Sequence, residues 1–120
     1  MKQTFFDRIP DNLPGGFFAY SATGEETLCF ADKNVLELYE CESMEELRSH
    51  AGNSFRGMVH PDDLERVEGE ISEQTFHRGG RHDYVHYRIR TRRGDTRYVE
   101  DFGHLVYDVD GDSYFMSLSR

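Results

Sequence analysis

Residues 84–107, YVHYRIRTRRGDTRYVEDFGHLVY, form the longest stretch of the chain that is rich in β-branched and aromatic residues. A turn at Arg93-Gly94-Asp95 interrupts this stretch, which predicts a β-hairpin with two long strands. Because successive side chains of a strand point to opposite faces, Val85, Tyr87 and Ile89 share one face. A hairpin of this length needs further strands and a cover for its apolar face, and the rest of the chain is expected to supply both.

Two registers of this hairpin are open. A two-residue loop would place Arg90 opposite Arg97, which is a like-charge pair. A three-residue loop would instead place Ile89 opposite Val99. Since each cross-strand pair contributes roughly 0.2–1 kcal/mol, the three-residue loop is favoured.

Length and charge limit the function classes. A chain of 120 residues predicts one domain. The net charge of −9 argues against nucleic acid or an anionic membrane as a partner, and no apolar run approaches the length of a membrane span. Cys29 and Cys41 do not make a disulfide framework. We therefore expect a soluble cytoplasmic domain with reduced thiols, whose parent protein could still be anchored in a membrane.

The residues before the hairpin predict two strands and short helices. Strands are expected over 17–22 and 27–31, joined by a glycine-containing turn. Asp32 is expected to cap a short helix, and Ser43 opens a capping box for a second helix. Gly52 is expected to end that second helix.

The longest helix is expected to begin at residues 60–63, His-Pro-Asp-Asp, because proline suits the first helical position and aspartate suits the positive end of a helix. Leu64, Val67 and Ile71 follow at helical spacing and form one apolar stripe. Gly79-Gly80 is expected to close the helix. A last strand is predicted over 114–119.

Together these elements predict an α+β domain with a five-stranded antiparallel sheet and its helices on one face. A short amphipathic helix is also predicted over 4–8, with Phe5, Phe6 and Ile9 as its apolar residues. We expect this segment and an exposed part of the sheet to form a homodimer, since soluble monomers seldom keep such apolar surface.

Particular residues accompany this element order. They are Pro14-Gly15-Gly16-Phe17, Asn34, Phe55, Met58 to Asp63, Tyr87-Arg88-Ile89 with Gly94, and Val99 to Gly103. The set resembles a PAS domain, specifically the fold-3-like subgroup with the HPDD motif, from a bacterial signalling protein. The resemblance covers nearly the whole chain.

The resemblance implies a strand order of 2-1-5-4-3 and a pocket between the sheet and the helices. It implies one PAS domain over 1–120, with an N-terminal cap segment over 1–15 and the core over 16–120. Such domains are sensory and dimerising modules without catalysis of their own. They usually regulate an output domain of the same chain, here a GGDEF-type diguanylate cyclase or a histidine kinase.

A small-molecule pocket is expected beside the short helices. The expected lining residues are Phe18, Tyr20, Leu36, Tyr39, Phe55, Met58 and Tyr87. Ordinary core packing would explain the same residues, and the domain would then be a ligand-free relay between its neighbours. A remote alternative is a small enzyme with the cone-shaped isomerase fold, which normally begins with long helices rather than strands.

No cofactor is identified, and no metal site is predicted. The flavin-adduct subgroup needs a cysteine inside a particular helix motif, whereas Cys29 is expected on a strand and Cys41 in a loop. Haem is disfavoured, with His77 as the sole candidate ligand. His82 and His86 share a strand face but lie about 13 Å apart at the rise of a strand, too far to chelate one ion.

A basic strip is expected on the long hairpin. Its residues are Arg88, Arg90, Arg92, Arg93 and Arg97. The simpler interpretation is a solvated sheet edge whose arginines pair with Glu100 and Asp101. The functional interpretation is a contact surface for an acidic helix of a partner.

Overall fold

The computed structural model describes residues 15–77 and 80–120, and it places five strands in one antiparallel sheet of order β2-β1-β5-β4-β3. The strands are β1 (Gly16–Ser21), β2 (Leu28–Ala31), β3 (His82–Arg90), β4 (Thr96–Tyr107) and β5 (Ser113–Ser119). The helices are α2 (Lys33–Leu38), α3 (Met44–Ala51), the 3-10 turn η1 (Phe55–Gly57), α4 (Pro61–Ser72) and the π-helical turn η2 (Glu73–His77).

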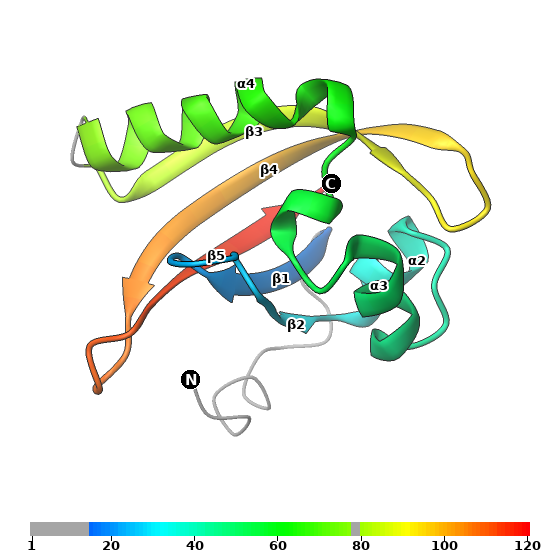
Figure 1. The fold of residues 1–120 in the computed structure, drawn as a ribbon, viewed down its shortest axis with the longest axis horizontal. Helices are drawn as coiled ribbons and strands as arrows, with labels where there is room; N and C mark the ends of the chain where they lie inside the picture. Colours follow the sequence, from blue (N-terminus) through cyan, green and yellow to red (C-terminus); the bar gives the residue numbers. More distant parts are fainter. Residues whose placement is uncertain (1–14, 78–79) are drawn as a thin grey trace.

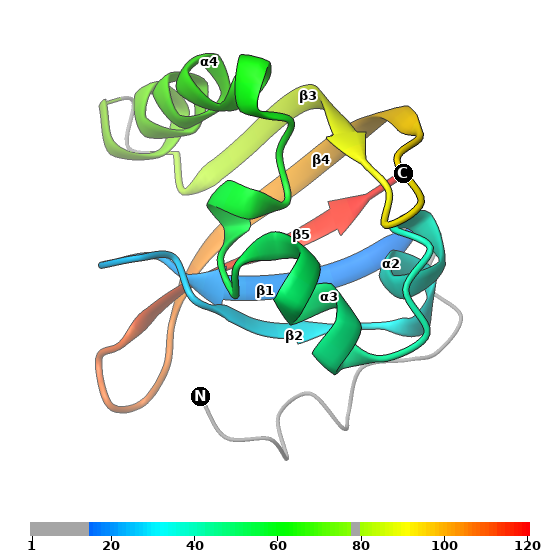
Figure 2. The same cartoon turned by 45° about the vertical axis from the view of Figure 1, so that its right-hand side comes forward.

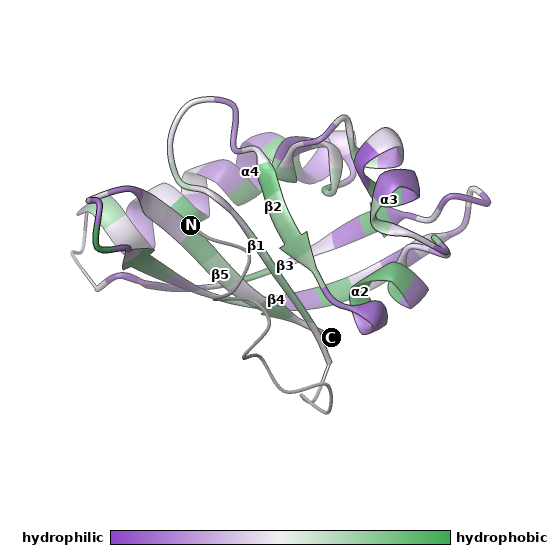
Figure 3. Cartoon of the chain, turned by 90° about the horizontal axis from the view of Figure 1, so that it is seen from below, coloured by the Kyte–Doolittle hydropathy of each residue, from purple (hydrophilic) through white to green (hydrophobic). Residues whose placement is uncertain are grey.

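The helices cover one face of the sheet. Figure 1 shows α4 running along β3 and β4, while α2 and α3 lie beside β1 and β2, and Figure 2 shows the same layers from another side. In Figure 3 β2 is coloured largely as hydrophobic, whereas α3 and α4 combine hydrophobic and hydrophilic colours, as expected of helices with one buried side. The predicted fold class and strand order are confirmed.

The predicted first hairpin is present as β1 and β2. A β-bulge between Ala19 and Tyr20 shifts its register, which bends the strand locally. The predicted N-terminal helix, and all but the last residue of the predicted cap segment 1–15, lie outside the described residues. No helix in the described part of the chain is long and apolar enough to cross a membrane.

Side chains start the short helices where the sequence predicts. The Val35 N–H donates to Asp32 Oδ1 at the start of α2 (3.0 Å), and the Glu46 N–H donates to Ser43 Oγ at the start of α3 (3.1 Å). The return bond of the capping box is displaced by one residue, because Glu46 Oε1 accepts from the N–H of Glu42 (3.1 Å). Gly52 ends α3 in the left-handed conformation (φ 62°), which glycine adopts without a steric cost.

The HPDD segment starts α4 as predicted. Pro61 is the first helical residue, and the Asp62 N–H donates to His60 Nδ1 (3.1 Å). Val67 and Ile71 are buried, so the predicted apolar stripe faces the sheet. The α-helix ends at Ser72, and the chain continues directly as the π-helical turn η2, so the described helical run reaches His77, two residues before the predicted end at Gly79-Gly80.

The long hairpin has neither of the two expected registers. Ile89 pairs with Arg97, and Tyr87 pairs with Val99, so the favoured register is wrong by two residues. Thr91 explains the shift. Its N–H donates to the Asp95 carbonyl (2.8 Å), and its hydroxyl accepts from the Asp95 N–H (3.0 Å), which closes a longer loop around the buried threonine.

The α4 stripe gives a direct test of the packing. Ile71→Ala should lower the free energy of unfolding by about 2–5 kcal/mol, because it removes buried methylenes and leaves a cavity. Glu65→Ala, at an exposed position of the same helix, should change it by less than about 0.5 kcal/mol. Urea unfolding of both variants measures the difference. Equal, small effects would mean that the stripe does not face the sheet.

Candidate functional site

The seven residues expected to line a pocket lie together between the sheet and the helices. Phe18 and Tyr20 come from β1, and Tyr87 comes from β3, the edge strand at the other end of the sheet. The helical side supplies the remaining four, which are Leu36, Tyr39, Phe55 and Met58. All seven belong to or pack against one core cluster, and Leu36 alone among them is only partly buried.

The aromatic rings of this cluster contact one another. The Tyr20 and Phe55 rings stack with centroids 4.3 Å apart and an interplanar angle of 3°. Phe18 stacks on both rings, and Tyr87 meets Phe55 edge-on (6.1 Å). The structure therefore brings the predicted residues together as packed core, and their role as ligand contacts stays a prediction.

A polar patch adjoins the rings on the inner face of β3 and β4. The Tyr87 hydroxyl donates to Asp101 Oδ2 (2.7 Å). Asp101 is only 1 % exposed, and its Oδ1 has no hydrogen-bond partner among the described residues. Burial raises the pKa of Asp101 to about 6, although the hydrogen bonds from Tyr87 and Ser117 act in the opposite direction.

Asp83 is the second carboxyl of the patch. It pairs with Gly103 across the hairpin, and a side chain at position 103 would collide with the Asp83 carboxyl, so glycine makes the room for it. Asp83 Oδ2 also lacks a hydrogen-bond partner within the described part of the chain. Burial, followed by repulsion from Asp101, raises the pKa of Asp83 to about 7.

A further acidic pair lies close to Tyr20. Burial raises the pKa of Glu26 to about 7, and its hydrogen bond with Glu68 and the charge of Glu68 add to the effect. Arg56 Nε lies 3.8 Å from Glu26 and 3.7 Å from Glu68. The charges of Glu26, Glu68 and both aspartates raise the pKa of Tyr20, after the larger effect of burial. The interior of the domain is therefore acidic beside its aromatic rings.

A contact between Asp63 of α4 and Arg88 of β3 holds the helix to the sheet. Asp63 Oδ1 accepts from Arg88 Nη2 (2.6 Å), and Asp63 Oδ2 accepts from both the Arg88 backbone N–H (2.8 Å) and Nε (3.1 Å). These bonds hold the pKa of Asp63 well below its usual range. The His60 N–H donates to the Arg88 carbonyl (2.8 Å), so the start of α4 is bound to β3 on two sides.

The arginines of the basic strip find partners within the described part of the domain, but neither expected partner, Glu100 or Asp101, is among them. Glu100 instead lies 3.4 Å from Arg120 Nε. Asp101 is buried and bonded to Tyr87, while Arg88 pairs with Asp63. Arg92 Nε lies 3.5 Å from Glu46, and Arg97 donates to the Leu38 carbonyl (2.8 Å). Arg93 Nε lies 3.7 Å from Glu40. Four of the five guanidinium groups thus have partners within the domain rather than present a free contact surface.

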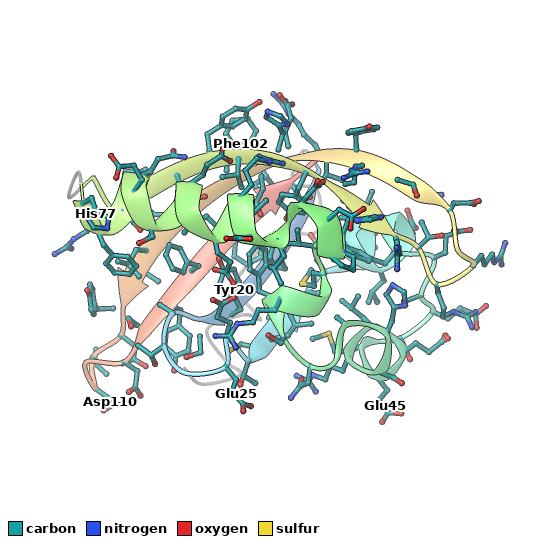
Figure 4. All side chains as sticks on the ribbon, turned by 45° about the horizontal axis from the view of Figure 1, so that its top comes forward. Tyr20, Glu25, Glu45, His77, Phe102 and Asp110 are labelled. Atoms are coloured by element: carbon teal, nitrogen blue, oxygen red, sulfur yellow. The ribbon has the colours of Figure 1, made fainter. Side chains whose placement is uncertain are left out.

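The outer face of the sheet, which the described helices leave uncovered, carries aromatic side chains. Tyr84 is 44 % exposed, Phe102 is 39 % exposed and Tyr98 is 79 % exposed. Figure 4 shows Phe102 on the side of the sheet away from α4, whereas Tyr20 lies beneath the helix. The strands therefore separate an acidic, aromatic interior from an aromatic outer face.

Comparison with known proteins agrees with this architecture. One family model, described as the PAS fold, matches residues 28–118. This chain belongs to the PAS family. No curated protein matches its sequence.

Solved structures share the PAS fold at low sequence identity. A PAS domain from a two-component sensor histidine kinase has a TM-score of 0.68 at 15 % identity, covering 92 % of this chain and 86 % of that one. The LOV protein of Rhodobacter sphaeroides has a TM-score of 0.75 at 18 % identity (100 % and 68 % covered). A sensory box histidine kinase/response regulator from Burkholderia thailandensis has a TM-score of 0.62 at 20 % identity (88 % and 74 % covered). The cone-shaped isomerase fold was the wrong alternative.

The two cysteines and the haem-ligand candidate His77 lie where the sequence placed them. Cys29 is on β2, and Cys41 is buried in the loop after α2. His77 is exposed at the end of η2, and Figure 4 shows its side chain at the margin of the domain. Residues 15–77 and 80–120 contain no group of three or more His, Cys, Asp or Glu side chains that could hold a metal ion.

The polar patch was missed at the level of sequence. Asp83 and Asp101 occupy the same inward-facing alternation as Val85 and Tyr87, and that alternation was the available signal. Aspartate is seldom buried, so Asp101 is expected from the sequence only as a partner of the exposed arginines, and Asp83 is not singled out. At the level of sequence only His86 is considered beside His82, and the two are found too far apart, whereas the structural neighbour of His82 is His104.

The raised pKa values predict a pH dependence of stability. The pKa of Asp83 rises from 3.8 to about 7, so the folded chain holds a proton that the unfolded chain releases between these values. Its contribution to stability is therefore complete below about pH 4 and is lost as the pH rises through about 7. The free energy of unfolding should fall between pH 5 and pH 8, and Asp83→Asn should make this fall smaller by roughly 1–3 kcal/mol. Urea unfolding of the parent chain and the variant at pH 5 and at pH 8 measures this difference.

Asp110→Asn, in the exposed turn between β4 and β5, serves as the matched control and should leave the pH dependence unchanged. The raised pKa values of Asp101 and Glu26 act in the same direction as that of Asp83, so the Asp83→Asn variant should still lose some stability as the pH rises. An Asp83→Asn variant with the same slope as the parent would show that the Asp83 carboxyl is ionised in the folded chain at pH 5.

Proposed function

We propose that this PAS domain is the sensory and dimerising module of a bacterial signal-transduction protein. Its output is a GGDEF-type diguanylate cyclase or a histidine kinase in the same chain, and the domain itself has no catalytic role. The observation that carries the sensory role is the pair of buried carboxyl oxygens, on Asp83 and Asp101, without hydrogen-bond partners among the described residues.

Such oxygens cost stability unless something satisfies them. A buried polar atom without a partner costs about 1–3 kcal/mol, and a charged one costs more. A domain that needed only packing would gain from apolar side chains at positions 83 and 101. A small molecule that donates hydrogen bonds or carries positive charge would satisfy both carboxyls, and its flat part would fit against the rings of Tyr20, Phe55 and Tyr87.

The sheet offers a short route from this interior to the outer face. On β4, Asp101 points to the interior and its neighbour Phe102 points to the outer face. A ligand that moves the Asp101 carboxyl therefore acts on the strand that carries Phe102. We infer that two copies pair through the outer face, with the segment 1–15 contributing, and that ligand binding changes this pairing.

The position of β5 supports coupling to an output domain. It is the central strand of the sheet (Figure 1), and Arg120 exchanges two backbone hydrogen bonds with Glu100 of β4 (2.7 and 2.9 Å). An output domain joined after Arg120 would thus be joined to the middle of the sheet. We infer that the module lies in the cytoplasm beside its output domain, whether or not the parent protein is anchored in a membrane.

A ligand-free relay is the second candidate, and the packing of the rings favours it. Tyr20, Phe55 and Phe18 contact each other directly, so side chains occupy the region predicted for a ligand. In that case the two carboxyls would be protonated and neutral. The domain would transmit strain between neighbouring domains through its dimer alone.

Native mass spectrometry of the 120-residue chain tests both parts of the proposal in one measurement. We expect a dimer that carries a small molecule, which denaturation releases. Phe102→Lys places a charge on the outer face and should shift the population to monomer, while the ligand stays bound. Val109→Lys makes the same change at a fully exposed turn position and should leave the dimer intact.

A ligand-free dimer that Phe102→Lys disrupts would replace the sensor with the relay. A chain that stays monomeric at its highest soluble concentration, with no bound molecule, would contradict the sensor and the relay alike.

A further inference from the structure

Two histidines face each other across the long hairpin on the outer face of the sheet. His82 of β3 is directly opposite His104 of β4. Their rings are stacked, with centroids 4.2 Å apart and an interplanar angle of 21°. Both side chains are exposed to solvent. The proposed sensory function uses neither residue.

The backbone brings these two side chains as close as an antiparallel pair allows. The Leu105 N–H donates to the Arg81 carbonyl (2.7 Å), which makes residues 81 and 105 a hydrogen-bonded pair. Hydrogen-bonded and non-hydrogen-bonded pairs alternate along such a ladder, so His82 and His104 form a non-hydrogen-bonded pair. The Cα atoms of such pairs lie about 4.5 Å apart, and their side chains approach most closely.

We propose that His82 and His104 chelate a divalent late transition-metal ion such as Zn²⁺, Ni²⁺ or Cu²⁺. Imidazole nitrogens bind these ions at about 2.0–2.1 Å. The rings are stacked face to face, and the terminal torsion of histidine is broad, so rotation about this torsion turns one nitrogen of each ring toward a shared point. The cross-strand pairing holds the two side chains close together, so the sheet itself preorganises the pair.

The surroundings leave room for the rest of the coordination shell. The two histidines border a surface hollow of about 420 Å³, whose walls include the rings of Tyr84 and Phe102. Water, or a ligand in the hollow, fills the remaining coordination positions. Gln74 also borders the hollow, but its amide is occupied by the backbone of Tyr84 (2.8 and 3.0 Å). The guanidinium of the neighbouring Arg81 lies over the ring of Tyr107 (5.3 Å) and is not part of the lining of the hollow.

The site has two protein ligands, so it should bind metal reversibly rather than hold it as a structural centre, which normally has four. His86, on the same strand and face, lies about 13 Å from His82 at the rise of a strand and does not contribute. A hard ion such as Mg²⁺ prefers oxygen ligands and should not bind the pair.

Isothermal titration of the untagged chain with Zn²⁺ or Ni²⁺ tests the proposal. We expect one ion per chain, and no response to Mg²⁺. His82→Ala and His104→Ala should each weaken binding by at least about tenfold, since even the loss of a residue that only supports a ligand weakens metal binding about 10–100-fold. His86→Ala, the matched control on the same strand, should bind as the parent does.

Histidine NMR signals identify the ligands independently of affinity. Substoichiometric Ni²⁺ should broaden the ring protons of His82 and His104 before those of His50, His60 and His86. Circular dichroism verifies that each variant is folded, which its exposed position favours. Absence of binding, or equal weakening by His86→Ala, would overturn the proposal, and the stacked rings would then be an ordinary cross-strand pair.

Discussion

The contact between Asp63 and Arg88 determines where the long helix lies, and the rest of the interior depends on that position. Both oxygens of Asp63 accept hydrogen bonds from Arg88, one of them from the backbone of β3 as well as from its side chain. Two charged groups with fork-like geometry make such bonds stronger than those between neutral groups. The HPDD segment therefore does two things, since His60 and Pro61 start α4 while Asp63 binds it to β3.

With α4 in place, its buried stripe and the turn η2 cover an interior that is both aromatic and acidic. The rings of Tyr20, Phe55 and Tyr87 account for its packing. The carboxyls of Asp83 and Asp101 do not serve packing, and Gly103 leaves space for one of them. Groups with strongly shifted pKa values gather at functional sites more often than elsewhere, and here they stand on strands that also form the outer face.

Most of the fold could be predicted from the sequence, because it depends on local signals. Asp32, Ser43 and His60 each start a helix by satisfying its first N–H groups, which a single sequence reveals. The exact register of the hairpin could not be predicted in this way. It depends on Thr91, whose buried side chain closes a loop longer than the turn signal Arg93-Gly94-Asp95 indicates.

Only the aromatic part of the candidate site could be predicted from the sequence, because only that part depends on local signals. Its aromatic residues were found, since apolar residues at inward positions are expected to be buried. Its carboxyls were not found, because burial of Asp83 and Asp101 depends on elements far away in the sequence. The pairing of His82 with His104 required the register, and a register error of two residues would have given each histidine a different partner.

A double-mutant cycle on Asp63 and Arg88 tests most directly whether their contact holds α4 over the interior. The free energy of unfolding would be measured for the parent chain, Asp63→Ala, Arg88→Ala and the double variant, and the same cycle on Arg66 and Glu70 would provide an exposed pair on the same helix. The coupling energy of Asp63 with Arg88 should clearly exceed that of the exposed pair, which should be small. A coupling no larger than that of Arg66 with Glu70 would contradict the account.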